Sequence, residues 1–247
     1  MEERPNPYSG EGIDKRPMRR KNGGKMLILA VIILVLAAAV ILIVRSFGGE
    51  PVIDTRSAET REISTVQDKI EEADWIDVNL LPLNEYSRPG TYLEEINSIV
   101  IHYVGNPATT ASQNRSYFAG LAKSGQAYAS SNFIIDLDGG ILECVPVDEV
   151  AYCSNIRNED SISIECCHPD ERGEFSAGTY ESAIKLAAWL CVEFELTADD
   201  VIRHYDISGK ECPIYYVVNE GEWDKLRENI AEEIDSLLAS REEAVPE

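Results

Sequence analysis

Basic side chains are scarce in this chain, which has 22 Lys and Arg against 44 Asp and Glu and a formal net charge of −22 at pH 7. The acidic excess lies in residues 51–247, which hold 14 basic and 39 acidic side chains. A surface of this sign repels the phosphate backbone of DNA and RNA. The composition therefore argues against nucleic acid as a partner, although net charge bears on solubility and association and not on the fold.

Histidine is rarer still, with three residues in the whole chain. His102 follows the apolar residues 99–101, and His204 shares a short polar segment with Cys212. Two imidazoles and a thiolate suit zinc, and three protein ligands leave a fourth coordination position open, as in catalytic zinc sites. Ligands so far apart in sequence form a weak pattern. A buried core histidine and an inert buried thiol therefore remain an equal alternative at this point.

One long uncharged run stands out near the N-terminus. Residues 26–44 carry no charge over 19 positions, close to the ~20 apolar residues that a membrane-spanning helix needs. A cleaved signal peptide usually has a shorter apolar region that ends in small residues, whereas this run meets Arg45 at once. Residues 1–25 hold seven basic side chains, and the more positive flank stays in the cytoplasm. We therefore expect an uncleaved single-pass anchor with the remainder of the chain outside.

Composition divides the chain into five segments, without internal repeats. Residues 1–25 are rich in Pro, Gly and Arg and predict a disordered cytoplasmic tail. After the membrane helix over 26–44, residues 45–74 are polar without a sustained apolar period and predict an extracellular stalk. We expect a compact domain over residues 75–240 and an acidic tail over 241–247.

The compact domain is predicted to mix strands and helices. Residues 98–104 are apolar and β-branched, which is typical of a buried strand, and residues 179–194 have small and apolar side chains at helical spacing. Asp138-Gly139-Gly140 predicts a hairpin turn. The full set of expected strands is 98–104, 131–136, 141–145, 161–166 and 201–203, and that of helices is 109–124, 179–194 and 223–238. The fold class is therefore α/β, with a mixed central sheet flanked by helices and enough residues for its own core.

The six cysteines all fall in the predicted extracellular part: Cys144, Cys153, Cys166, Cys167, Cys191 and Cys212. An oxidising exterior permits disulfides. If Cys212 binds metal, an odd number remains. A Cys144–Cys153 bridge and the absence of any bridge are both open, because connectivity cannot be deduced from sequence.

Two charged residues are candidates for catalysis. Glu165 lies near the end of the predicted strand 161–166, where burying a carboxylate is costly unless it is paired or near a metal. It is a candidate general base for a metal-bound water. Lys210 stands two residues before Cys212, where its ammonium group would stabilise an oxyanion. Taken alone, these positions are better explained by a solvent-exposed glutamate and a surface lysine. His168 is expected in a loop near the cleft and not as a ligand.

Several stretches together resemble the zinc-dependent N-acetylmuramoyl-L-alanine amidase family, which includes phage lysozyme-type amidases and peptidoglycan recognition proteins. In family order over roughly residues 80–230, they are Ser87-Arg-Pro-Gly90, Ile99-Val-Ile-His102-Tyr103, Ser130-Ser-Asn-Phe-Ile-Ile-Asp136, Val150-Ala-Tyr-Cys153, Ser161-Ile-Ser-Ile-Glu165, Ile202-Arg-His204-Tyr-Asp206 and Lys210-Glu-Cys212-Pro213. The combination is specific, although each stretch alone is not.

The resemblance implies a zinc site and a reaction. His102, His204 and Cys212 match the family's zinc ligands, Glu165 matches a residue that activates water in some members, and Lys210 matches the lysine near the metal. The implied substrate is the amide between N-acetylmuramic acid and L-alanine of the peptidoglycan stem peptide. Asn132 and Cys153 depart from the family, because many relatives carry histidine there. These departures put substrate contacts in doubt and not the metal.

The implied substrate and the predicted topology agree, since peptidoglycan lies outside the cytoplasmic membrane, on the side where the compact domain is expected. We therefore expect a bacterial membrane-anchored amidase that binds peptidoglycan and Zn2+. Contact of the basic N-terminal tail with anionic lipid is also expected. Two alternatives stay open. The first is a tethered peptidoglycan-binding or sensing module without hydrolysis, and the second is a zinc hydrolase that acts on another amide.

Overall fold

A computed structural model describes residues 56–244 of the chain. The predicted cytoplasmic tail (1–25) and membrane helix (26–44) lie outside the described residues. Between residues 56 and 244, no helix is both long and apolar enough to cross a bilayer.

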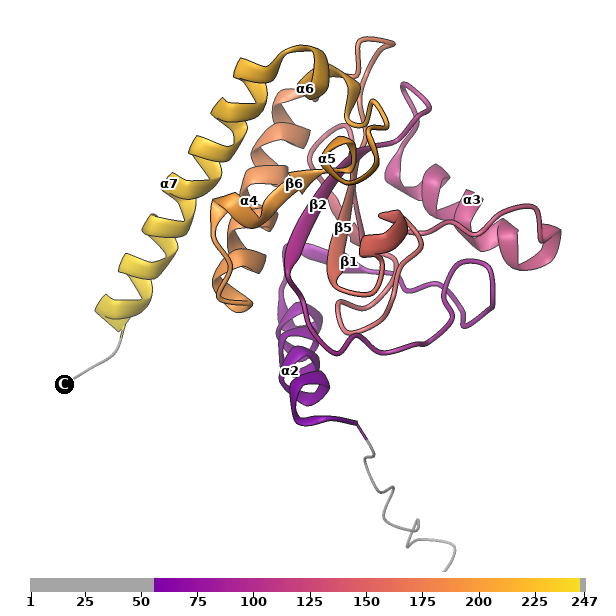
Figure 1. The fold of residues 1–247 in the computed structure, drawn as a ribbon, viewed down its shortest axis with the longest axis horizontal. Helices are drawn as coiled ribbons and strands as arrows, with labels where there is room; N and C mark the ends of the chain where they lie inside the picture. The colour runs from indigo at the N-terminus through magenta and orange to yellow at the C-terminus, as the bar shows by residue number, and fades with distance from the viewer. Residues whose placement is uncertain (1–55, 245–247) are drawn as a thin grey trace, which may run out of the picture. The chain divides into compact units, whose positions relative to one another are not determined.

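A six-stranded mixed sheet forms the centre of the described domain (Figure 1). Its strands in chain order are β1 (Ile76–Val78), β2 (Ser98–Tyr103), β3 (Phe133–Ile135), β4 (Ile141–Glu143), β5 (Ser161–Cys166) and β6 (Val201–Arg203). Their spatial order is β1-β4-β3-β5-β2-β6, and only the β3–β4 pair is antiparallel. The turn at Asp138-Gly139-Gly140 joins that pair, as predicted. The α/β class with a mixed sheet flanked by helices is confirmed.

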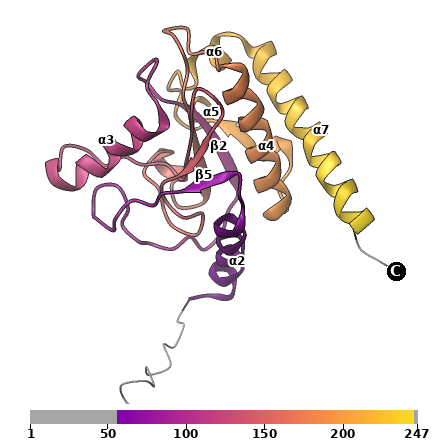
Figure 2. The same ribbon diagram turned by 180° about the vertical axis from the view of Figure 1, so that it is seen from behind.

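Helices cover both faces of the sheet. One face carries α4 (Ala177–Glu193) and α7 (Glu220–Ala244), which lie side by side, and α3 (Ala111–Ser124) lies on the opposite side (Figures 1 and 2). The first face buries strand residues such as Ile99 and Ile164 against α4 and α7. The second buries Ile134 against α3 residues Phe118 and Leu121. Because both faces are covered, the central strands are apolar on both sides, which explains their continuous hydrophobic runs.

Local sequence sets the ends of these helices. Thr110 caps α3, since its side chain accepts from the amide of Gln113 while the Gln113 side chain accepts from the Thr110 amide. This reciprocal pair satisfies two amide groups that the first turn of a helix leaves free. Gly125 ends α3 with φ of +61°, a conformation that glycine adopts without strain. The loop from Val104 to Thr110 thus leads from the carboxyl end of β2 into a helix whose first turn is capped.

The stalk predicted over residues 45–74 is wrong for its second half. Residues 58–72 form a helix, α2 (Ala58–Glu72), and its Ile63, Val66 and Ile70 are buried in the domain. Two further buried positions of this helix are polar, Thr60 and Gln67. Its buried stripe therefore contains few apolar residues, which is why the sequence showed no sustained apolar period. The compact domain begins at α2 and not at residue 75.

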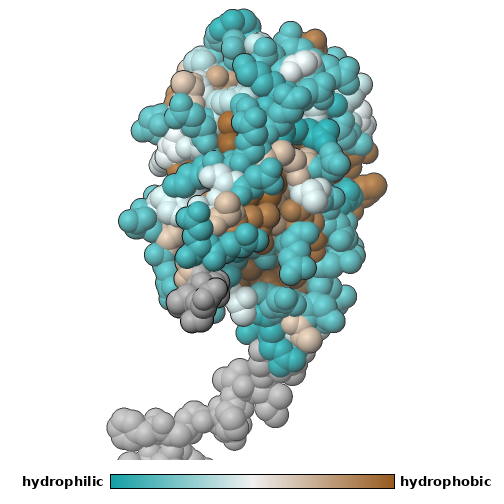
Figure 3. Space-filling model, turned by 90° about the vertical axis from the view of Figure 1, so that its left-hand side faces the viewer, coloured by the Kyte–Doolittle hydropathy of each residue, from teal (hydrophilic) through white to brown (hydrophobic). Residues whose placement is uncertain are grey.

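Other boundaries also differ from the prediction. Strand β1 was not among the expected strands, and α7 runs on to Ala244, past the predicted domain end at 240. Two short helices, α5 (His204–Ser208) and α6 (Ile214–Val218), were not predicted. The side of the domain that carries α7 is mainly hydrophilic, with hydrophobic residues gathered in one central area (Figure 3). A mainly hydrophilic surface agrees with the 27% of charged residues in the chain.

Candidate metal centre

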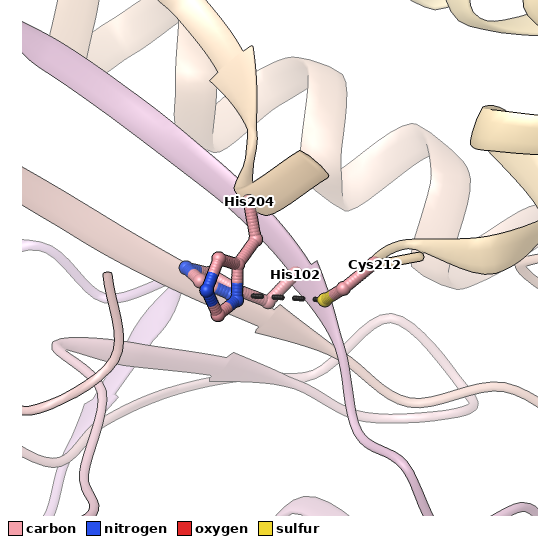
Figure 4. A group of neighbouring side chains, drawn as sticks. All are labelled: His102, His204 and Cys212. Atoms are coloured by element: carbon pink, nitrogen blue, oxygen red, sulfur yellow. Dashed lines mark hydrogen bonds between the residues drawn. The ribbon is translucent and has the colours of Figure 1, made fainter. Parts of the chain in front are cut away.

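The three predicted metal ligands converge on one point (Figure 4). His102 lies on β2, His204 is the first residue of α5, and Cys212 lies in the loop before α6. One ligand atom from each lies within 4.8 Å of the other two. The Cys212 Sγ is 3.8 Å from His102 Nδ1, and the two imidazole rings are 4.8 Å apart between centroids. Residues 110 positions apart in sequence thus meet in one cluster.

Parallel strand pairing brings the two histidines together. Strand β2 pairs with β6 in a register that places Ile101 opposite Arg203. The next residue along the chain is a histidine in both cases, His102 still within β2 and His204 directly after β6, so the two lie at the same end of the sheet. The carboxyl ends of parallel strands form the usual ligand-binding edge of an α/β sheet.

The segment from Arg203 to Cys212 is folded back by its own hydrogen bonds. Arg203 donates to both carboxylate oxygens of Asp206 and to the carbonyl of Tyr216, at 2.8–3.0 Å. Gly209, with φ of +74°, ends α5 and lets the chain reverse. The amide of Tyr205 donates to the Cys212 carbonyl at 2.9 Å, which closes the loop. These contacts hold the thiol next to the imidazoles.

The donor set fits a zinc ion. Both ring nitrogens of His204 are buried without a hydrogen-bond partner among the described residues. Leaving buried polar atoms unpaired is costly, so such atoms usually have a partner. His102 Nε2 lies 3.1 Å from Ser154 Oγ, which leaves Nδ1 to face Cys212. A second hydrogen bond of this kind orients metal-binding histidines in known sites.

Burial sets the protonation of these groups in the absence of metal. It lowers the pKa of His102 well below its ordinary value, and the nearby His204 and Lys210 add to the effect. The neutral imidazole is the form that binds metal. Burial raises the pKa of the Cys212 thiol to about 12. A divalent cation would supply a positive charge next to the buried thiolate and so stabilise it.

Glu165 lies beside His102 and faces an open cleft. The β2–β5 register places His102 directly opposite Glu165. Burial raises the pKa of Glu165 to about 7, while a hydrogen bond from Cys153 and the charge of Lys210 lower it. Glu165 and Lys210 both line a cleft of about 500 Å³ that α3 borders with Gln113 and Tyr117. All five predicted site residues are therefore brought together, although their roles stay predictions.

A larger cavity of about 980 Å³ lies elsewhere, between the start of α2 and residues 152–160. None of the five predicted site residues lines it. We place the functional site at the smaller cleft, because the chemistry converges there.

Ser154 and Cys153 are site residues that the sequence did not assign. Ser154 Oγ bonds His102, and Cys153 Sγ lies 3.5 Å from Glu165 Oε1. Asn158 holds both in place, because its Oδ1 accepts from the amides of Cys153 and Ser154 at 3.0 and 2.6 Å. The sequence marked Cys153 only as a departure from the family within the Val150–Cys153 stretch, and Ser154 only as the residue after it. No spacing rule pointed to a serine behind the metal ligand.

Asn132 and His168 have structural contacts instead. Asn132 is fully buried, and its side chain connects Ser163 on β5 with the carbonyl of Pro146. His168 is also buried, with its two nitrogens on the carbonyls of Val104 and Asp170. Neither belongs to the ligand cluster, which agrees with the expectation for His168 as a non-ligand.

The six cysteines, all within the described residues, are free thiols. The Cys144–Cys153 bridge that the sequence left open is therefore not formed.

Comparison with known proteins points to one family. Residues 92–214 match the family described as N-acetylmuramoyl-L-alanine amidase. The N-acetylmuramoyl-L-alanine amidase CwlL of Bacillus licheniformis is 30% identical over 176 residues, covering 66% of this chain and 47% of the relative. The N-acetylmuramoyl-L-alanine amidase BlyA of Bacillus subtilis (strain 168) is 30% identical over 182 residues, covering 65% and 48%.

A solved structure agrees with these relatives. The catalytic domain of XlyA superposes with a TM-score of 0.53 at 25% identity, covering 63% of this chain and 98% of that domain. The chain spans about half the length of the curated relatives it matches. The shared part is therefore the domain that carries the cluster described above.

Proposed function

Because its residues 92–214 belong to the N-acetylmuramoyl-L-alanine amidase family, we propose that this chain is a peptidoglycan hydrolase. The bond cleaved is the amide between N-acetylmuramic acid and L-alanine of the stem peptide. The observation that carries the proposal is the convergence of His102, His204 and Cys212 beside Glu165 at an open cleft. A carboxylate next to a three-ligand site is the arrangement that metal-assisted hydrolysis needs.

His102, His204 and Cys212 would hold the zinc ion. When bound there, zinc supplies a Lewis acid and lowers the pKa of a water molecule in its open position toward ~7. The three side chains are buried, so the sheet and the loop before α6 fix their positions. Ser154 keeps the His102 ring oriented through its Nε2.

Glu165 is proposed to move the proton. Its pKa of about 7 allows its carboxylate to accept a proton from water near neutral pH and to return it to the departing amine. Its oxygen Oε2 is shielded and has no partner among the described residues, so it is free to accept. Lys210 lines the same cleft, where its positive charge would stabilise the oxyanion that forms from the amide carbonyl.

We also propose a membrane anchor, on the sequence alone. The uncharged run 26–44, flanked by seven basic side chains in residues 1–25, supports a single-pass helix with the catalytic domain outside the cell. Such a tether would keep the domain near peptidoglycan in a bacterial envelope. Fractionation of cells tests it, since the chain should stay with membranes after a high-salt wash, and deletion of residues 26–44 should release it.

Hydrolysis is tested with the full chain and purified cell wall. The expected products are free stem peptides with a new L-alanine amino terminus and no new reducing sugar ends. Activity should disappear after removal of metal by a chelator and return with Zn2+. Binding to the wall without release of peptide would instead support the non-hydrolytic binding module.

Matched variants connect the activity to the site. Cys212→Ser and Glu165→Gln should each abolish release, with Glu165→Gln still binding one metal ion per chain. Cys191→Ala is the control, because Cys191 is a buried free thiol on α4, outside the ligand cluster. If Cys212→Ser retains full activity, the zinc mechanism is wrong, and if only other amides are cleaved, the substrate assignment is wrong.

A further inference from the structure

A second group of ligand-type side chains lies next to the first. It consists of His102, Cys153 and Glu165, and one ligand atom of each lies within 4.8 Å of the other two. Cys153 comes from the turn after residue 150 and Glu165 from β5. The two groups share His102. Four other ligand-type side chains therefore surround the His102 ring, two from each group.

Cys153 and Glu165 already contact each other. The Sγ lies 3.5 Å from Glu165 Oε1, while Glu165 Oε2 is shielded from solvent without a partner among the described residues. A thiol gives only a weak hydrogen bond and satisfies one oxygen at most. The carboxylate therefore has spare acceptor capacity toward the interior of the site. A bound cation would satisfy it.

We propose that Cys153 and Glu165 bind a second divalent, sulfur-preferring cation such as Zn2+ beside the first, and that this ion inhibits the enzyme. The inhibitory half rests on the proposed hydrolase function, whereas the binding half rests on the geometry alone. Zinc accepts cysteine sulfur and carboxylate oxygen ligands in proteins. On binding, metal–sulfur and metal–oxygen bonds form, the S–H bond breaks, and the thiol proton leaves to solvent.

Charge balance favours such an ion. The thiolate of Cys153 and the carboxylate of Glu165 carry two negative charges, which match the two positive charges of the cation. Adjacent divalent ions ~3.5–4 Å apart are known in hydrolases. His102 gives Nδ1 to the first cluster, and its Nε2 lies 3.1 Å from Ser154 Oγ. Cys153 and Glu165 would therefore hold the second ion, with solvent completing its coordination.

The second site is less deeply buried than the first. His102, His204 and Cys212 are buried, whereas Cys153 and Glu165 are partly exposed, and Glu165 lines the cleft. Lys210 lines the same cleft, so its positive charge opposes the entry of a second cation. The second ion should thus bind more weakly than the first and appear only when metal is in excess.

Occupation would remove the proton acceptor. Glu165 can either ligate a cation through its oxygens or accept a proton from water, and it cannot do both at once. Excess metal should therefore reduce kcat while the first ion stays in place. Cys153 is responsible for this sensitivity, since it supplies the sulfur ligand.

Metal stoichiometry tests the binding half. The full chain loaded with one equivalent of Zn2+ is titrated with further Zn2+, and the ions retained per chain are counted by native mass spectrometry. Wild type should reach two ions, while Cys153→Ser and Glu165→Gln should each hold one, with affinity for the second weakened on the order of 100-fold. Cys191→Ser is the matched control and should hold two. One ion in wild type, or two in Cys153→Ser, would overturn the proposal.

Inhibition is measured separately. Excess Zn2+ should inhibit release of stem peptides by wild type and Cys191→Ser, whereas Cys153→Ser, compared with its own activity at one equivalent, should resist. Lys210→Met should bind the second ion more tightly, because the opposing charge is gone. Two ions bound without inhibition would refute the inhibitory role and leave the site itself supported. A chain with no amidase activity would refute the proposed function, and the ion count would still decide the second site.

Discussion

The buried carboxyl group of Glu143 makes the stability of this domain depend on pH. Glu143 ends β4 and is completely buried. Gln67 on α2 donates to its Oε2 at 3.1 Å, and Oε1 has no partner among the described residues. Burial raises the pKa of Glu143 to about 8, with the hydrogen bond from Gln67 acting in the opposite direction. The group is therefore mostly protonated in the folded chain at neutral pH.

The sign and size of the effect follow from linkage. A carboxyl group whose pKa is raised by folding keeps more protons in the folded state. The penalty is absent below the unfolded pKa of 4.5, grows as pH rises, and levels off above about 8. At pH 7 ionisation of the unfolded chain destabilises the fold by roughly 3 kcal/mol, within about 1 kcal/mol. Glu143→Gln cannot ionise and keeps an acceptor for Gln67, so it should stabilise the chain by that amount.

Urea unfolding of the two proteins at pH 4 and pH 7 measures this difference. Glu143→Gln should unfold at higher urea than wild type at pH 7, and the gain should nearly vanish at pH 4. Glu72→Gln on the exposed side of α2 is the control and should change stability little at either pH. An equal effect of Glu143→Gln at both pH values, or a loss of stability at pH 7, would refute the reasoning.

Three further predictions concern the site and its support. Ser154→Ala should weaken zinc affinity about 10–100-fold in a competition titration, because His102 loses its orienting partner. In wild type kcat/KM should fall as pH drops below about 7, since protonated Glu165 cannot accept a proton, and a bound cation would move the midpoint lower. Arg88 donates to the buried carboxylate of Glu149 through two nitrogens, each at 2.7 Å. Arg88→Met leaves this carboxylate unpaired and should lower the free energy of unfolding in urea by about 3 kcal/mol. Adding Glu149→Gln in the same chain should recover part of the loss.

Most of the sheet and the large helices could be predicted because hydrophobic periodicity is strong there. Strands β5 and β6 were predicted with the bounds they have, and β2 within one residue. Helix α2 could not, since its buried positions include Thr60 and Gln67, whose partners Leu93 and Glu143 are distant in sequence. A polar residue buried by a tertiary hydrogen bond looks like a surface residue in the sequence. The expected stalk was an error of this kind.

The ligand cluster could be predicted in part, because some of its residues belong to a rare residue type. Histidine is so rare in this chain that His102 and His204 drew attention as residue types, Cys212 joined them through the polar segment it shares with His204, and the family resemblance supported the set. The roles of Ser154 and Cys153 could not be predicted in this way, because they depend on the direction that a turn gives to each side chain. Asn158 fixes that turn through two backbone amides. Such contacts cannot be read from spacing alone.

Buried polar atoms without hydrogen-bond partners help to distinguish a hydrolase from a module that only binds peptidoglycan. A wall-binding module needs a shaped groove, and it gains nothing from buried polar atoms without partners, each of which costs about 1–3 kcal/mol. This chain keeps both nitrogens of His204 and one oxygen of Glu165 in that condition at a single place. A cation at the first cluster would bind one nitrogen of His204, and a proton on Glu165 would remove the cost of burying its charge. That coincidence supports the amidase proposal over the binding module, and loss of metal should lower the melting temperature of the chain if it is correct.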